Sequence, residues 1–375
     1  MIEPDISQTD IRERTGCDKS TVSVIVKRLE ELGIVSRTLT VKSGHRGRPK
    51  DRLRIVEDAG LLIGVHLEYP LFRFTAAGIA GAPLKVWTTE VPEQPDRLGD
   101  AILAGLHKLK RKLGKSPDEA LSIGISVPGQ IRSDGFVSHS SGLGWNTIDL
   151  LGQLADRLKA PVFIGNEMKG AALAEHYFGA ARGANDFLLI RAGADVGGAF
   201  FLDGAIYGGA DGYAGEIGHT KVVRNGRRCQ CGAAGCLAAY LTKDALIEQA
   251  RSVDPSIATL DAIVDHAREG TEGIVTLLKE CGELTGLAVA NMVNALNVPV
   301  IIPAGHLVKL WPFLERGFRT ALKENSLAAP LRSLRIHLSQ LRSETFPLTG
   351  TAIALDGLVS VAVPGGSGPA AADSE

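Results

Sequence analysis

Four side chains between residues 219 and 236 form the set best suited to chemistry. His219 is followed by three of the chain's five cysteines, Cys229, Cys231 and Cys236. One nitrogen and three sulfur ligands complete a tetrahedral zinc ion and leave no position for water or substrate. The spacing therefore predicts a structural zinc that ties its loop in place. The metal-free alternative is a buried histidine with three incidental cysteines.

Composition sets the broad class of the protein. The chain has 375 residues, which suits two or three domains, and its net charge is −1. Clustered cysteines favour a metal in a reducing compartment over a disulfide framework. The start, MIEPDISQTD, is acidic and unlike a signal peptide, and no apolar run approaches the about 20 residues of a membrane span. We therefore expect a cytoplasmic, soluble protein that does not enter a membrane.

The residues after position 57 alternate between apolar β-prone runs and helical stretches, which predicts an α/β domain with a largely parallel sheet. The expected strands are 61–67, 121–127, 161–165, 187–193 and 300–305. The expected helices are 97–114, 148–159, 168–178, 241–252, 272–295, 308–325 and 349–361. No internal repeat is visible, and the Pro/Gly/Ala/Ser tail 363–375 is expected to be disordered.

The first 57 residues are short, charged and helical. Ser7 and Asp10 fit a capping box, and Gly16 fits a helix end. Asp18 then caps a second helix, whose apolar positions have helical spacing: Val22, Ile25, Val26, Leu29 and Leu32. Two such helices form a helix-turn-helix, although a plain helical hairpin fits the same pattern. Five exposed residues of the second helix are expected to contact the major groove of DNA: Lys19, Ser20, Thr21, Ser23 and Lys27.

A basic loop favours the DNA-binding interpretation. Between Arg37 and Arg54 there are seven Lys and Arg residues against the single acid Asp51. The loop contains Arg46, Gly47, Arg48 and Pro49, the core of an AT-hook, whose arginines lie along a narrow A·T minor groove. It lies between two β-prone runs, which predicts the tip of a wing; a solvated basic loop is the alternative. A winged helix usually has one more helix ahead of these two; we expect either that the true start lies upstream or that this domain lacks that helix.

These motifs together resemble a transcriptional repressor of the ROK family, which contains repressors, uncharacterised frames and sugar kinases. The resemblance covers about residues 7–360. It is carried by KSTVSVIVKRLEELGIV, GRPK, ALAEHYFGAARG and GEIGHTKVVRNGRRCQCGAAGC. It implies a two-lobed actin-like ATPase fold (ribonuclease H-like) at 58–362 behind a winged helix-turn-helix at 1–57. It also implies a sugar in the cleft, a structural zinc, and a homodimer or homotetramer.

The resemblance also implies sugar-binding roles for Asn166, Glu167, Glu216 and His219. Glu216 would accept hydrogen bonds from sugar hydroxyls, and the His219 imidazole would connect the metal with the sugar. Ala238 stands where the family has a glutamate that holds sugar hydroxyls. This difference implies another carbohydrate, weak affinity or an unused pocket. Trp145 either stacks on the sugar or packs in the core.

Catalysis by this chain is not expected. The family's kinases carry two glycine-rich phosphate turns, but here the first is His66-Leu67-Glu68-Tyr69-Pro70 and the second contains Asp195. A carboxylate, an aromatic ring and a proline without an N–H cannot replace glycine amides around a phosphate. At the position of the kinase base Glu167 is one methylene longer than aspartate, and about 1 Å of misplacement can cost about 100-fold.

The leading hypothesis is a DNA-binding repressor of carbohydrate-related genes, which binds a double-stranded operator and is controlled by a sugar or sugar derivative. One alternative is a ROK sugar kinase with an appended domain. Another is a regulator controlled by a protein partner, which the change at Ala238 permits.

Overall fold

The computed structural model describes residues 6–31, 33–39, 51–56, 59–132, 134–140, 144–154, 156–341 and 348–362. Two compact units divide the chain, Met1–Glu167 with Pro347–Glu375 and Met168–Phe346. The AT-hook residues Arg46, Gly47, Arg48 and Pro49, together with Leu32 and the tail after residue 362, lie outside the described residues.

The N-terminal segment of the first unit has the predicted helix-turn-helix and wing. Its elements are α1 (Gln8–Thr15), α2 (Lys19–Glu31), β1 (Val35–Leu39) and β2 (Asp51–Ile55). Ser7 and Asp10 form the expected capping box, and Gly16 ends α1 in the left-handed conformation. Strands β1 and β2 pair antiparallel, and Ile6 bridges to Leu53.

The buried face of α2 is narrower than the sequence predicts. Val22 and Val26 are buried and form a small core with Leu53. Ile25, predicted to lie on this face, is 51% exposed. Among the described residues of the segment, α1 and the β1–β2 hairpin cover α2, so residues spaced four apart suffice to reach its core.

The rest of the first unit is a five-stranded sheet with the order β10-β6-β3-β4-β5. Its strands are β3 (Leu62–Glu68), β4 (Leu71–Ala77), β5 (Pro83–Glu90), β6 (Ser122–Val127) and β10 (Val162–Asn166). Around it lie α3 (Leu98–Leu113), α4 (Leu150–Leu154), α12 (Leu348–Ala362) and the small sheet of β7 (Gln130–Ile131), β8 (Val137–Ser140) and β9 (Trp145–Ile148). The helix expected at 148–159 is thus shorter and ends at Leu154.

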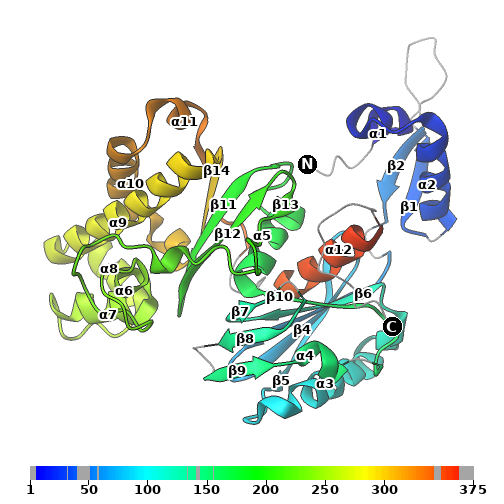
Figure 1. Cartoon of the computed structure of the whole chain (residues 1–375), viewed down its shortest axis with the longest axis horizontal. Helices are drawn as coiled ribbons and strands as arrows, with labels where there is room; N and C mark the ends of the chain where they lie inside the picture. The colour runs from blue at the N-terminus through cyan, green and yellow to red at the C-terminus, as the bar shows by residue number, and fades with distance from the viewer. Residues whose placement is uncertain are drawn as a thin grey trace. The chain divides into compact units, whose positions relative to one another are not determined.

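The C-terminal helix α12, drawn in red in Figure 1, packs against β3 and β6 of this sheet. Glycine permits this close approach, because a Cβ atom on Gly124 would lie 2.0 Å from the carbonyl oxygen of Gly350. Trp145 is 7% exposed and belongs to the same unit's core, so of its two predicted roles the structure favours packing.

The second unit repeats the strand order of the first. Its sheet runs β13-β12-β11-β14-β15, from β11 (Phe187–Ala192), β12 (Val196–Leu202), β13 (Ala205–Ile206), β14 (Val300–Gly305) and β15 (Arg335–Ile336). In each unit three antiparallel strands are followed by two parallel to the first. This repeat is topological, which is why the sequence alone does not reveal it.

The second unit also contains several helices. They are α5 (Glu167–Phe178), α6 (Ala238–Leu241), α7 (Lys243–Arg251), α8 (Leu260–Arg268), α9 (Glu272–Leu296), α10 (His306–Asn325) and α11 (Ala328–Ser333). The first residue of α5, Glu167, is the last of the first unit's leading segment, and the second unit begins at Met168. The long helices α9 and α10 pack against each other (Figure 1). In the described ranges no helix is long and apolar enough to cross a membrane.

Candidate functional site

The structure brings the four predicted metal ligands together. One ligand atom from each of His219, Cys229, Cys231 and Cys236 lies within 4.8 Å of the others. The Sγ atoms of Cys231 and Cys236 are 3.7 Å apart, and Cys229 Sγ lies 3.7 Å from His219 Nδ1. Two zinc–sulfur bonds of about 2.3 Å at a tetrahedral angle span about 3.8 Å. The donor set and its spacing therefore fit zinc, and these residues could bind a metal ion.

Tight turns in the loop create this arrangement. His219 ends a 3₁₀ turn, Ile217–His219. The backbone N–H of Cys229 donates to the carbonyl of Ala233 at 2.8 Å, which turns the chain between the cysteines. Gly235 has φ +77°, and a Cβ atom there would lie 1.8 Å from the carbonyl oxygen of Val223. Only glycine fits at this position.

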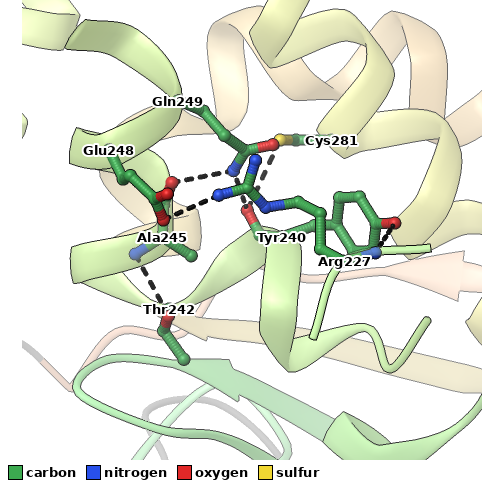
Figure 2. Close-up of polar contacts among 7 residues, drawn as sticks. All are labelled: Arg227, Tyr240, Thr242, Ala245, Glu248, Gln249 and Cys281. Atoms are coloured by element: carbon green, nitrogen blue, oxygen red, sulfur yellow. Dashed lines mark hydrogen bonds and ion pairs between the residues drawn. The ribbon is translucent and has the colours of Figure 1, made fainter. Parts of the chain in front are cut away.

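Hydrogen bonds attach the metal loop to the helices beside it (Figure 2). The backbone N–H of Arg227 donates to the Tyr240 hydroxyl at 2.9 Å, and its guanidinium pairs with Glu248 at 2.7 Å. Gln249 donates to the Tyr240 carbonyl at 3.1 Å, and the Cys281 thiol lies 3.7 Å from the same oxygen. The loop is thereby connected to α6 and α7, and α6 in turn contacts α9.

The surroundings act differently on the cysteines. Burial raises the pKa of the Cys229 thiol to about 11. A hydrogen bond from the backbone of Ala233 lowers the pKa of Cys231. The ammonium group of Lys221 donates to Cys236 Sγ at 2.7 Å, which raises the pKa of that lysine. Lys221 was not predicted from the sequence, but it is a positive group placed beside a sulfur ligand.

Of the predicted sugar-binding residues, His219 is itself a predicted metal ligand and Glu216 lies beside it. The Nε2 atom of His219 is 3.9 Å from Glu216 Oε2, and these side chains are 43% and 48% exposed. Lys169 of α5 donates to the Gly212 carbonyl in the loop that leads to Glu216. Burial lowers the pKa of Lys169, and the charge of Glu216 opposes this. The sequence analysis missed Lys169, although a lysine in the apolar run MKGAALA was a visible signal.

The other two predicted sugar-binding residues belong to the first unit. Asn166 is the last residue of β10, and its side-chain amide donates to the Gly129 carbonyl at 2.5 Å. Glu167 is the first residue of α5. Ala238, which the resemblance predicts to stand at the position of the family's glutamate, is 7% exposed in the second unit.

The turn after β3 has the form of a tight hairpin. Glu68 pairs across it with Leu71, and the Glu68 carboxylate lies 2.6 Å from the Arg73 guanidinium. His66 is buried, and its Nδ1 atom lies 3.2 Å from Ser126 Oγ and 3.3 Å from Thr349 Oγ1. In the second unit, Asp195 lies exposed in the turn between β11 and β12.

The predicted DNA-contacting residues of α2 are all exposed: Lys19, Ser20, Thr21, Ser23 and Lys27. Val24 lies among them and is 69% exposed, a position that the sequence analysis did not single out. Arg37 at the base of the wing is bound within the fold, since its guanidinium contacts Glu30 at 2.6 and 3.1 Å. Arg37 is therefore less available to DNA than was assumed when it was counted among the seven basic residues of this segment.

Residues 75–353 match the ROK family, and residues 1–48 match the MarR family. The chain belongs to the ROK family. The xylose repressor of Caldicellulosiruptor bescii is 27% identical to this chain over 95% of this chain and 93% of its own. A glucokinase of Halalkalibacterium halodurans is 30% identical over 66% of this chain and 80% of its own. Repressors and kinases are thus both relatives.

A solved ROK structure has the same fold over nearly the whole chain. It is described as a ROK family transcriptional regulator, a homologue of the Escherichia coli MLC protein. Its TM-score is 0.80 at 22% identity, and the match covers 95% of this chain and 93% of that one. The expected fold class, a winged helix-turn-helix joined to an actin-like α/β domain, is confirmed. The xylose repressor matches 95% of this chain and the glucokinase 66%, which favours a repressor over a kinase.

Proposed function

We propose that this ROK protein is a DNA-binding transcriptional repressor controlled by a sugar or sugar derivative. The observation that carries the proposal is a winged helix-turn-helix on the same chain as the ROK domain, in a chain that matches a xylose repressor over 95% of its own length. The glucokinase match covers 66% of the chain. Selection of binding sites from random DNA, followed by release with candidate sugars, tests the proposal.

DNA recognition would follow the usual geometry of this motif. The exposed face of α2 would enter the major groove, with Ser20, Thr21 and Ser23 near base edges and Lys19 and Lys27 near phosphates. Val24 on this face suits contact with a thymine methyl group. Arg46 and Arg48, on either side of Gly47 and followed by Pro49, would enter an adjacent A·T-rich minor groove.

A symmetric oligomer is part of the proposal. A homodimer would place two α2 helices in successive major grooves, with half-sites about one helical turn or a small multiple apart. A homotetramer would contain two such pairs. The palindrome and spacing found by site selection would report this symmetry.

The metal we propose is one structural zinc per chain, held by His219, Cys229, Cys231 and Cys236. A bound zinc would supply positive charge that keeps the cysteines as thiolates. With three sulfur ligands and one nitrogen the ion has no open position, so its role is to hold the loop. His219 would use Nδ1 for the metal, and its Nε2 would remain toward Glu216.

The effector would bind near Glu216 and His219 in the second unit. Carboxylates and amides bind sugar hydroxyls, and Glu216 is half-exposed beside the metal loop. Melting of the protein with pentoses, hexoses, aminosugars and their phosphates would identify the ligand class. A protein that responds to none of these would favour control by a protein partner.

Phosphoryl transfer is not part of the proposed function. The hairpin after β3 presents a carboxylate paired with Arg73 and a proline, where a kinase would present glycine amides to phosphate. Exposed Asp195 adds a negative charge at the second turn. Both features disfavour a nucleoside triphosphate.

A further inference from the structure

The hydroxyl groups of Ser20 and Thr21 both donate to one carboxylate at the start of α2. Thr21 Oγ1 donates to Asp18 Oδ2 at 2.6 Å, and Ser20 Oγ donates to Asp18 Oδ1. All three side chains are exposed. A hydroxyl has one proton and two lone pairs, so each of these groups has its only proton already in use.

The Asp18 carboxylate is itself fixed by the backbone. Its Oδ1 atom accepts from the N–H of Ser20 at 2.7 Å and from the N–H of Thr21 at 3.0 Å. These hydrogen bonds, led by the one from the Ser20 hydroxyl, hold the pKa of Asp18 well below its usual range. Asp18 is therefore ionised under any DNA-binding condition, and an ionised carboxylate only accepts hydrogen bonds.

We infer that Asp18 sets the hydrogen-bond polarity of the DNA-reading surface, so that Thr21 meets bases as an acceptor. The inference rests on the proposed DNA-binding function. In the major groove the donors are adenine N6 and cytosine N4, whereas guanine O6 and N7 and thymine O4 accept. An acceptor at Thr21 therefore selects adenine or cytosine on the strand it contacts. Asp18 is thus a positioning residue for sequence specificity.

The substitution Asp18→Asn reverses the polarity and keeps the cap. Asparagine caps helices about as well as aspartate, because its amide oxygen accepts the same backbone N–H groups. Its Nδ2 group would then donate to Thr21 Oγ1, which frees the hydroxyl proton for DNA. The half-site position contacted by Thr21 should change from adenine or cytosine to guanine or thymine.

The experiment is selection of binding sites by the full chain at fixed salt, for wild type, Asp18→Asn, Thr21→Val and Thr21→Ser. We expect about tenfold discrimination at one half-site position for wild type. Asp18→Asn should invert that preference, Thr21→Val should abolish it, and Thr21→Ser should keep it. The readout is base preference, because removing the Asp18 charge raises affinity for every sequence alike.

The outcomes distinguish failure of this inference from failure of the proposed DNA-binding function. Wild type that enriches no site would contradict the proposed function. Wild type that enriches a palindrome and keeps the same base preference in Asp18→Asn would overturn the inference alone, as would a wild-type preference for guanine or thymine lost in Thr21→Val. Were Asp18→Asn to melt below the assay temperature, the Thr21→Val and Thr21→Ser pair would decide.

Discussion

The Nε2 atom of His219 lies 3.9 Å from Glu216 Oε2, while the Nδ1 atom of the same ring lies 3.7 Å from Cys229 Sγ. One imidazole thus connects the proposed metal site with the proposed sugar site. A zinc ion that holds this ring in one orientation would also determine which ligands the neighbouring Glu216 carboxylate can bind.

Zinc content is the first consequence. We expect one zinc per chain, and Cys229→Ser should lower both zinc content and the free energy of unfolding, the latter by more than about 2 kcal/mol. Elemental analysis with thermal melting measures both. The matched control is Cys17→Ser, which lies in the small N-terminal core and should leave zinc unchanged. Substoichiometric zinc in wild type that does not fall in Cys229→Ser would contradict the site.

The attachment of the loop to α6 can be tested without touching the metal ligands. Tyr240→Phe removes the oxygen that accepts from the Arg227 N–H. We expect a loss of about 1 kcal/mol in unfolding free energy with zinc retained, because one hydrogen bond is lost. Urea denaturation measures the loss, and Tyr207→Phe, at a tyrosine that is 50% exposed, should change little. Equal stability of the two variants would show that this hydrogen bond is unimportant.

Stability should depend on pH through His306. Burial lowers its pKa to about 4, and its Nε2 atom lies 2.8 Å from the Leu241 carbonyl. The unfolded chain, with a histidine pKa of about 6.5, binds more protons between these values. The part of the free energy of unfolding that depends on a neutral His306 is therefore fully present above about pH 6.5. It falls by about 3 kcal/mol as the pH drops toward 4.

His306→Gln keeps a hydrogen-bond donor and cannot titrate. The difference in free energy of unfolding between this variant and wild type should shift by about 3 kcal/mol between pH 7 and pH 4, as measured by denaturation. The control is His107→Gln, because His107 is exposed on α3. Parallel pH profiles for wild type and His306→Gln would contradict the assignment.

No ATP-dependent phosphorylation of hexoses is expected. Glu68, Pro70 and Asp195 stand in the turns that the resemblance to ROK kinases predicts would hold phosphate. A coupled assay over common hexoses should give no turnover above the enzyme-free rate. Turnover that disappears in Glu167→Ala would instead support the kinase alternative.

Much of the fold follows from local sequence signals. Capping residues fix the start of α1, since Ser7 and Asp10 bond each other's backbone within one turn. Apolar runs fix β3, β6, β11 and β14, which are inner strands of the two sheets, and the edge strand β10. The antiparallel strands β4, β5 and β12 were not predicted, because their pairing depends on neighbours rather than on their own composition.

The four metal ligands were also predictable, because one histidine and three cysteines at this close sequence spacing are typical of a structural zinc site. The surrounding contacts were not, since they join distant positions such as Lys221 with Cys236 and Arg227 with Glu248. The exposure of Ile25 was likewise hidden, because helical spacing alone does not say how much of a helix its neighbours cover.

The most direct test of the account is selection of binding sites from random DNA, with wild type and Arg48→Ala compared at the same salt concentration. We predict that wild type enriches a palindrome with A·T-rich flanks, and that Arg48→Ala weakens binding and relaxes the A·T preference, since a narrow A·T groove attracts arginine. A sugar that binds the ROK domain should then change the affinity for the selected site. Failure of wild type to enrich any palindrome, or an Arg48→Ala variant with unchanged affinity and flanking preference, would contradict the account.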